Sequence, residues 1–225
     1  MKKTQTLQYQ LSLVLLIMMH IAGVIGLHWH ITHFYFQYLI GFNLILTNII
    51  LFSFHQSFEK KFIISFLLIA FLGFLIELLG VHTGVIFGKY QYEWALGFKI
   101  VEVPLLIGLN WVMLIYCSSH CVEYFFSLDK YKKTLAIVLK SILVATLMTS
   151  IDYFIEPFAI RFHLWQWENN IIPLQNFIGW WISALLLSFI FFNLSFERKN
   201  SLAMPLYFIQ FLFFFVNYYI ILYIS

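Results

Sequence analysis

Carboxyl and amide side chains occur inside or at the ends of long apolar segments of this chain, where polar groups are rare. Glu77, Asp152 and Glu156 lie near the ends of two such segments, and Asn176 lies at the start of a third. Ionisable residues at membrane depth are costly to bury and are functional candidates by default. Because a carboxyl group can donate or accept a proton, this pattern indicates acid–base chemistry.

The spacing of these residues places them on shared helix faces. One stripe, at i, i+4, i+7 and i+11, consists of Ala145, Thr149, Asp152 and Glu156. Two other stripes combine a polar residue with small residues, which let helices approach closely in lipid. They are Gly73, Glu77, Gly80 and Gly84, and Asn176, Gly179 and Ser183. We therefore expect several helices to deliver polar groups to one depth, with Glu102 joining them from one turn inside the fourth apolar segment.

The elements that position these groups are predicted to be membrane helices. The chain has 225 residues, of which 62% are hydrophobic and only 10% charged, whereas soluble domains carry about 25% charged residues. A membrane span needs about 20 apolar residues. Seven segments qualify, near 7–27, 34–54, 62–80, 100–121, 133–153, 173–195 and 202–224. We predict an all-α polytopic membrane helix bundle that forms a single integral membrane domain over residues 1–225.

The distribution of Lys and Arg predicts how this bundle is oriented. With seven spans, nine of these residues fall on the N-terminal side, and Lys89, Lys99 and Arg161 fall on the other; Lys140 lies inside a span. The positive-inside rule then predicts a multi-pass protein of the inner (cytoplasmic) membrane, with a cytoplasmic N-terminus and an external C-terminus. The first segment follows two lysines but has no clear small-x-small cleavage site, so we expect a membrane helix there.

Several of these residues also have a purely structural interpretation. Glu156 precedes Pro157 and would then mark a helix end, and Glu102 would form a modest surface ion pair with Lys99. The tryptophans would form an interfacial aromatic belt, an interpretation that is favoured for Trp29 and Trp181. For Glu77 and Asp152 the functional interpretation is favoured, because both are placed within membrane depth.

Neither a metal site nor a haem site is indicated. Cys117, His120 and Cys121 supply too few zinc ligands at this spacing. The histidines do not form pairs at matched depths on facing helices, as a membrane diheme bundle requires. No run of like charge indicates a nucleic-acid surface. We therefore expect no cofactor, no metal and no nucleic-acid partner.

Four stretches in order resemble the carotenoid biosynthesis hydratases, the membrane enzymes related to bisanhydrobacterioruberin hydratase. They are Glu77 through Thr83 and Gly84 to Tyr90 and Tyr92, Val103-Pro104 followed by Trp111, Asp152 through Pro157 to Trp165-x-Trp167, and Ile172-Pro173 through Asn176 to Gly179-Trp180. The resemblance covers roughly residues 70–181. It implies addition of water to the terminal double bond of an acyclic carotenoid end group. It also implies a lipophilic carotenoid substrate, contact with membrane lipid, and other carotenoid-pathway enzymes as candidate partners.

Physical reasoning assigns roles to the residues of these stretches. Hydration of a trisubstituted alkene needs a proton donor, a water molecule and a site that tolerates a tertiary cation. Burial in lipid-like surroundings raises the pKa of a carboxyl group, and neighbouring carboxyls can separate into one acid and one base. The predicted catalytic residues are Glu77, Asp152, Glu102 and Asn176. The predicted substrate-binding residues, including rings that stabilise a cation, are Thr83, Tyr90, Tyr92, Trp111, Glu156, Trp165, Trp167 and Trp180.

Other functions remain open on the sequence alone. A small membrane lycopene cyclase would protonate the same end group but let a double bond of the chain capture the cation. A transporter or channel would need polar residues along a path through the membrane, and Thr47 and Asn48 are the strongest indication of one. A non-catalytic assembly subunit of a pigment complex is a further alternative. Hydration itself changes no net electron count and so requires no redox cofactor.

Overall fold

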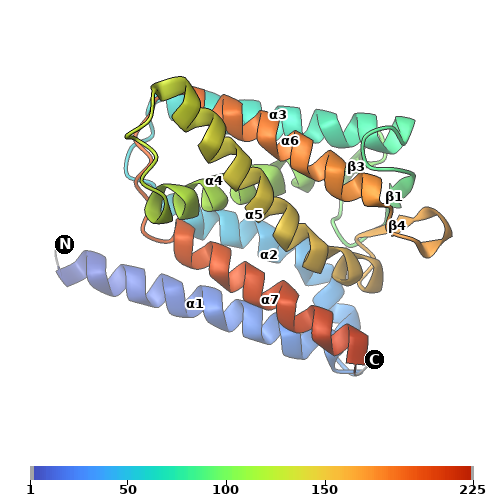
Figure 1. Cartoon of the computed structure of the whole chain (residues 1–225). Coiled ribbons are helices and arrows are strands. Elements are labelled where there is room, and N and C mark those ends of the chain that lie inside the picture. The colour runs from blue at the N-terminus through green and yellow to red at the C-terminus, as the bar shows by residue number, and fades with distance from the viewer. Residues whose placement is uncertain (1–2, 224–225) are drawn as a thin grey trace.

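The computed structural model describes the backbone of residues 3–223 and the side chains of residues 6–223. Over this range the chain forms seven long helices that run across the molecule, with the two ends of the chain at opposite sides (Figure 1). They are α1 (Lys3–His28), α2 (His33–Ser53), α3 (Lys60–Thr83), α4 (Leu106–Phe125), α5 (Lys133–Arg161), α6 (Leu174–Asn193) and α7 (Ala203–Tyr223). The predicted all-α membrane bundle is confirmed. Lys2 and the last position of the expected span 202–224 lie outside the described residues.

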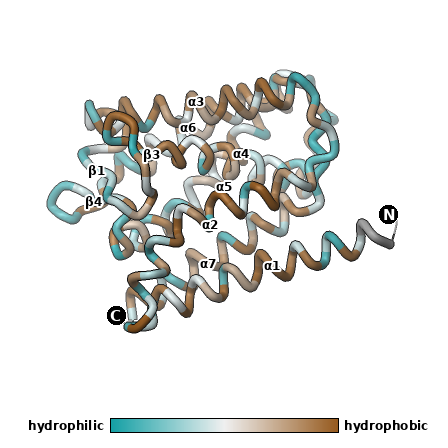
Figure 2. The backbone as a smooth tube through the Cα atoms, turned by 180° about the vertical axis from the view of Figure 1, so that it is seen from behind, coloured by the Kyte–Doolittle hydropathy of each residue, from teal (hydrophilic) through white to brown (hydrophobic). Residues whose placement is uncertain are grey.

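The surface of the bundle matches a membrane environment. Figure 2 shows apolar helices with hydrophilic residues gathered in the connections at both ends. By length and composition, six of the described helices are long and apolar enough to cross a membrane, all except α4. Helix α4 contacts α2, α3, α5, α6 and α7, and thirteen of its twenty residues are buried. Because its neighbours are protein and not lipid, α4 can carry polar residues such as the fully buried Ser118 and Ser119.

Two helix boundaries differ most from the sequence prediction, the start of α4 and the end of α5. Helix α4 begins at Leu106 and not near residue 100, because Lys99–Ile100 (β2) pairs with Val103–Pro104 (β3) in a tight hairpin. Glu102 lies in its turn with φ 65°, so its placement inside the fourth span is wrong. Helix α5 continues to Arg161 with Pro157 in its interior. Burial of Phe158 and Ala159 in the last turns offsets the hydrogen bond that proline removes.

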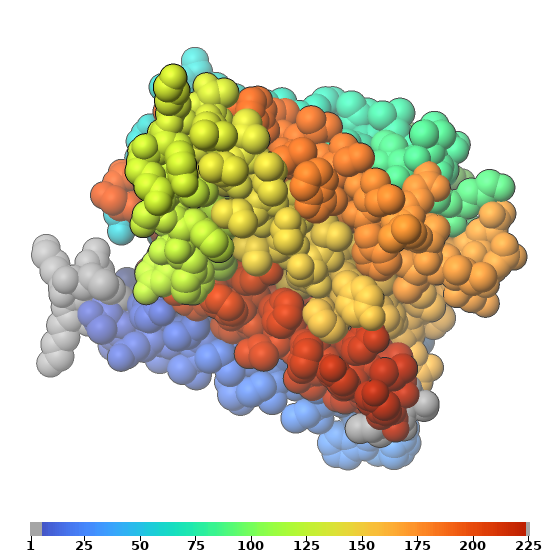
Figure 3. Space-filling model, in the orientation of Figure 1, coloured from blue at the N-terminus to red at the C-terminus, as the bar shows by residue number. Residues whose placement is uncertain are grey.

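The two long connections meet in a small antiparallel sheet at one end of the bundle. Strands β1 (Tyr90–Tyr92) and β4 (Trp165–Trp167) pair Tyr90 with Trp167 and Tyr92 with Trp165. We call this pair of strands the lid sheet; it projects beyond the helices in Figures 1 and 3. Alternate residues of a strand point to opposite faces, and all four rings point to the inner face, where Tyr92, Trp165 and Trp167 are buried. The lid sheet therefore covers the end of the bundle with aromatic side chains.

The opposite end of the bundle is held by ion pairs. Lys140, expected inside a span, extends its Nζ to Glu123 Oε1 at 3.4 Å and to Asp129 Oδ1 at 3.0 Å. Arg198 binds the same Glu123 at 3.2 Å. The Lys140 stem is buried while its charged head finds partners, which is the usual behaviour of a lysine near a helix end. These pairs tie α4 and α5 to the connection between α6 and α7.

Candidate active site

Glu77 of α3 accepts hydrogen bonds from three aromatic side chains. Tyr90 and Tyr92 donate their hydroxyls to its Oε2 at 2.5 and 2.8 Å, and Trp111 Nε1 of α4 donates to Oε1 at 3.0 Å. The Glu77 residue is only 2% exposed. Gly73, one turn away, makes this possible, since a Cβ there would stand 2.7 Å from Trp111 Cγ. The predicted stripe of small residues thus brings α3 and α4 together at this carboxyl group.

The two tyrosines remain hydrogen-bond donors over a wide pH range. Burial, and then the nearby Glu77 carboxyl group, raise the pKa of Tyr90 and of Tyr92 well above its ordinary value. A phenol that keeps its proton can donate to a carboxylate but cannot serve as a base near neutral pH. Their role in this site is therefore to hold Glu77 and to present their rings.

Glu156 of α5 has a matching environment. The indole nitrogens of Trp165 and Trp167 donate to its Oε2 at 3.0 and 2.6 Å, and Asn176 Nδ2 of α6 donates to Oε1 at 2.8 Å. The residue is fully buried. The interpretation of Glu156 as a marker of a helix end is therefore wrong, because the side chain holds β4 against the bundle.

Asp152, one turn before Glu156, is bound less completely. Asn176 Nδ2 also donates to its Oδ2 at 3.1 Å, so one amide bridges the two carboxyl groups. The other oxygen, Oδ1, is buried and has no hydrogen-bond partner. Of the three carboxyl groups, Asp152 is thus the one with an unoccupied oxygen.

The three carboxyl groups have no counter-ion among the residues that the structure describes. Among the side chains that the structure describes, no Lys, Arg or His forms an ion pair with Glu77, Asp152 or Glu156. Three uncompensated buried charges would be very costly. Hydrogen-bond donors and protons shared within the cluster must therefore take the place of a cation. We call Glu77, Asp152, Glu156 and Asn176 the carboxyl cluster.

A small cavity lies between the two halves of the cluster. Its volume is about 10 Å³, and Glu77, Glu156 and Asn176 line it together with aromatic rings. A cavity of about this size holds one water molecule. Two of the lining rings, Tyr90 and Trp167, lie 5.0 Å apart, and a third, Trp180, stacks on Trp111 behind it with centroids 4.4 Å apart. Phe87 also lines the cavity, although its sequence position marks it only as an apolar residue between Gly84 and Gly88.

The structure brings together all the predicted site residues except two. Thr83 is exposed; its hydroxyl donates to Leu79 O at 2.6 Å and accepts from Val85 N, so it serves the end of α3. Glu102 is exposed in the β2–β3 turn and does not reach the cluster. Its expected ion pair is also not seen, because Lys99 Nζ donates to Tyr92 O at 2.5 Å. Substitution of Thr83 or Glu102 should lower activity less than substitution of the buried residues.

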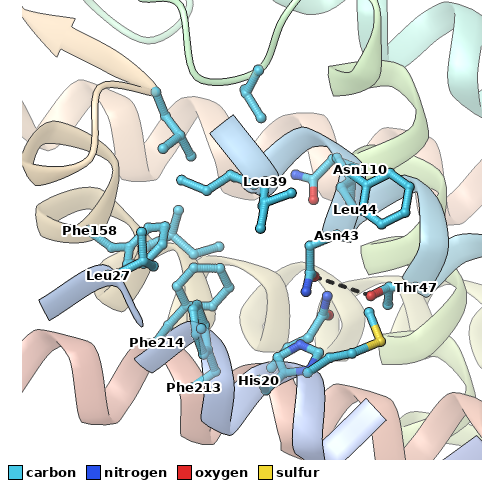
Figure 4. Close-up of a pocket in the computed structure, with 18 of the residues that line it drawn as sticks. His20, Leu27, Leu39, Asn43, Leu44, Thr47, Asn110, Phe158, Phe213 and Phe214 are labelled. Atoms are coloured by element: carbon cyan, nitrogen blue, oxygen red, sulfur yellow. Dashed lines mark hydrogen bonds between the residues drawn. The ribbon is translucent and has the colours of Figure 1, made fainter. Parts of the chain in front are cut away.

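A second, larger cavity adjoins the cluster. It has a volume of about 300 Å³, and Trp165 lines both it and the small cavity. Figure 4 shows side chains of several helices around it, among them the polar residues His20, Asn43 and Thr47. In the sequence these polar residues occur singly within apolar segments. That they line one common cavity could not be predicted from the sequence. Within residues 3–223, no group of three His, Cys, Asp or Glu side chains is arranged to hold a metal ion.

Comparison with known proteins gives one match. A family model described as carotenoid biosynthesis protein matches residues 35–224. The matched range contains every residue of the carboxyl cluster and both strands of the lid sheet, and it begins after α1. No curated protein and no solved structure matches this chain.

Proposed function

Since this chain belongs to the carotenoid biosynthesis protein family, we propose that it is a hydratase that adds water to the terminal double bond of an acyclic carotenoid end group. The observation that supports this reaction is the carboxyl cluster: Glu77, Glu156 and Asn176 line a cavity of about 10 Å³ together with aromatic rings, and Asn176 also donates a hydrogen bond to Asp152. Hydration needs an acid, a water molecule and a cation-tolerant wall, and this site has a group for each.

Asp152 is the proton donor in this proposal. Glu77 and Glu156 each accept three N–H or O–H hydrogen bonds, and an acceptor-only pattern is typical of an ionised carboxylate. Asp152 accepts one hydrogen bond and keeps Oδ1 free. A proton on Oδ1 would need no rearrangement of the surrounding hydrogen bonds, and it lowers the charge of the cluster by one.

The remaining groups would act on the cation and the water. Transfer of the Asp152 proton to the CH carbon of the terminal alkene leaves a tertiary cation on the dimethyl carbon. Trp165, Trp167 and Tyr90 present ring faces that stabilise such a cation. Water in the small cavity supplies the oxygen, and Glu77 or Glu156 takes its second proton. One water is consumed, one C–O and one C–H bond form, and the proton count of the cluster is restored when that proton returns to Asp152.

The position of the site suits a polyene that lies along the membrane normal. The lid sheet is at the end of the bundle where the helices meet their hydrophilic connections (Figure 2). An extended C40 carotenoid is about as long as the ~30 Å hydrocarbon core. Its end group can therefore reach the cluster while the far part of the polyene stays in lipid. By the distribution of Lys and Arg, this end is proposed to face outward.

Expression of the chain in a lycopene-accumulating host tests the reaction. We expect a product with a tertiary hydroxyl at one or both ends and, in H₂¹⁸O, one ¹⁸O per hydroxyl. Oxygen taken from O₂ would exclude hydration. A ring-closed product without added oxygen would show that the chain's own double bond captures the cation, as in a lycopene cyclase.

Two substitutions examine the role of the cluster in the same host. Glu77→Gln and Asp152→Asn should each abolish product while the protein still inserts in the membrane. Thr83→Ala is the matched control, because Thr83 belongs to the same sequence motif but lies outside the cluster. Full activity in both carboxyl variants would exclude acid and base roles for Asp152 and Glu77.

A further inference from the structure

The larger cavity has the shape and lining of a binding site for an apolar chain. It occupies about 300 Å³ among five helices, α1, α2, α4, α5 and α7, which is within the usual range for ligand pockets. Its walls carry Phe158, Phe213 and Phe214, whose rings face a common space in Figure 4. Aromatic and aliphatic walls of this kind favour a flat, unsaturated hydrocarbon.

The mouth of this cavity opens toward lipid and not toward water. Ala22 of α1 and Leu39 and Phe42 of α2 line the cavity and are also exposed on the outer surface of these helices. Both helices are apolar enough to cross a membrane. A hydrophobic molecule dissolved in the bilayer can therefore enter sideways, without crossing the hydrophilic end of the bundle.

One side chain forms a shared boundary between this cavity and the carboxyl cluster. Trp165 lines the large cavity and also donates its Nε1 hydrogen to Glu156 Oε2 at 3.0 Å. From Phe36 to Thr47 the cavity follows α2 for about 16 Å at 1.5 Å per residue, which is close to half the length of an extended C40 polyene. The polar groups at its inner end, His20, Asn43 and Gln210, include no carboxylic acid, so the reaction is assigned to the other end.

We propose that this cavity binds the reacting half of the carotenoid, which enters from lipid between α1 and α2 and stops with its end group against Trp165. The far half of the molecule remains in the bilayer. This inference rests on the proposed function, because it takes the carotenoid as the substrate.

The alternative location is a lipid-facing groove between α5 and α6. Thr149, Ser150, Tyr153 and Trp181 are among the residues that line it, and Thr149 and Tyr153 are close to Asp152 in sequence. The groove has a volume of about 440 Å³ but is more open than the cavity, and its residues do not contact the lid sheet through any hydrogen bond among those described. Because both places are near the cluster, an experiment must fill each of them separately.

The test measures pigment bound to the full chain, with catalysis blocked by Asp152→Asn. Each protein is purified in mild detergent from a lycopene-accumulating host, and the absorbance of lycopene is compared with the amount of monodisperse protein. Ala22→Trp and Leu39→Trp place a bulky ring on opposite lips of the cavity. Each should lower bound pigment about tenfold or more, by the usual cost of overpacking. Ser150→Trp fills the groove and should leave the bound pigment unchanged.

The outcomes separate this inference from the proposed reaction. Loss of pigment in Ser150→Trp, with retention in both lip variants, would place the polyene in the groove and overturn the inference. Equal pigment in all variants, or none bound by any of them, would also overturn it. Pigment lost only in the lip variants, together with a ring-closed product of the unsubstituted protein, would support the cavity and reject hydration.

Discussion

Asp152→Asn should remove activity and leave the fold intact, because of how Asp152 is bound. The asparagine carbonyl can take the place of Oδ2 and still accept from Asn176, where the present distance is 3.1 Å. Its NH₂ group then occupies the site of Oδ1, which has no partner now. The substitution exchanges one unpaired buried oxygen for one unpaired buried NH₂ group. We expect a change in stability within about 1 kcal/mol, while loss of a general acid lowers the rate by ~10²–10⁴-fold.

The assay has two readings on the same preparation. Product per unit of membrane-inserted protein is measured in a lycopene-accumulating host, and thermal unfolding is followed in detergent. Turnover above about a tenth of the unsubstituted level, with an unchanged unfolding temperature, would exclude Asp152 as the proton donor. A large fall in unfolding temperature would show instead that Asp152 is needed for the fold. The unpaired Oδ1 would then not be evidence that Asp152 carries the catalytic proton.

Three other substitutions follow from the same contacts. Glu156→Gln must lose the hydrogen bond from Asn176 or the hydrogen bonds from both tryptophans. At about 1.5–3 kcal/mol per charge-assisted hydrogen bond, the unfolding temperature should fall by roughly 3–12 °C. An unchanged unfolding temperature would contradict the role of Glu156 in holding β4. Gly73→Ala places a Cβ 2.7 Å from Trp111 Cγ and should cost ~1–3 kcal/mol, with a change in indole fluorescence; a silent substitution would argue against the close helix contact. Folding raises the pKa of Tyr92, by burial and then by the nearby Glu77, so this tyrosine stabilises the fold fully below about pH 10 and less as the pH rises further. Tyr92→Phe should therefore make the unfolding temperature fall less steeply at alkaline pH. An equally steep fall in the variant would exclude Tyr92 as its source.

The sequence was sufficient for the fold class and for most of the cluster. Long apolar segments predict membrane helices, and helical spacing correctly grouped Asp152 with Glu156 and Glu77 with small residues. These features are local, since one face of one helix determines them. The same local rule failed at Pro157, where packing of Phe158 keeps α5 helical. It also failed at Glu102, because pairing of β2 with β3 makes α4 begin only at Leu106.

The contacts between distant segments were beyond prediction from one sequence. Pairing of β1 with β4 joins residues more than 70 positions apart, and no turn or short spacing in the sequence predicts it. The hydrogen bonds from Trp165 and Trp167 to Glu156 depend on that pairing. The large cavity likewise lies where side chains of five helices leave a common space unfilled. The order of apolar residues along the sequence does not predict such a cavity.

The lid sheet gives the carboxyl cluster a structural role besides the proposed catalysis. Glu77 holds both tyrosines of β1 and Glu156 holds both tryptophans of β4, so the two acids fasten the same sheet from opposite strands. A cation that forms beneath the sheet would compete with these N–H and O–H donors for the negative charge. In the proposed reaction, binding of the lid sheet and stabilisation of the transition state would both depend on the carboxyl groups of Glu77 and Glu156. For this reason Asp152, which does not hold the lid sheet, is the group in the cluster that can change its proton without loosening the cover of the site.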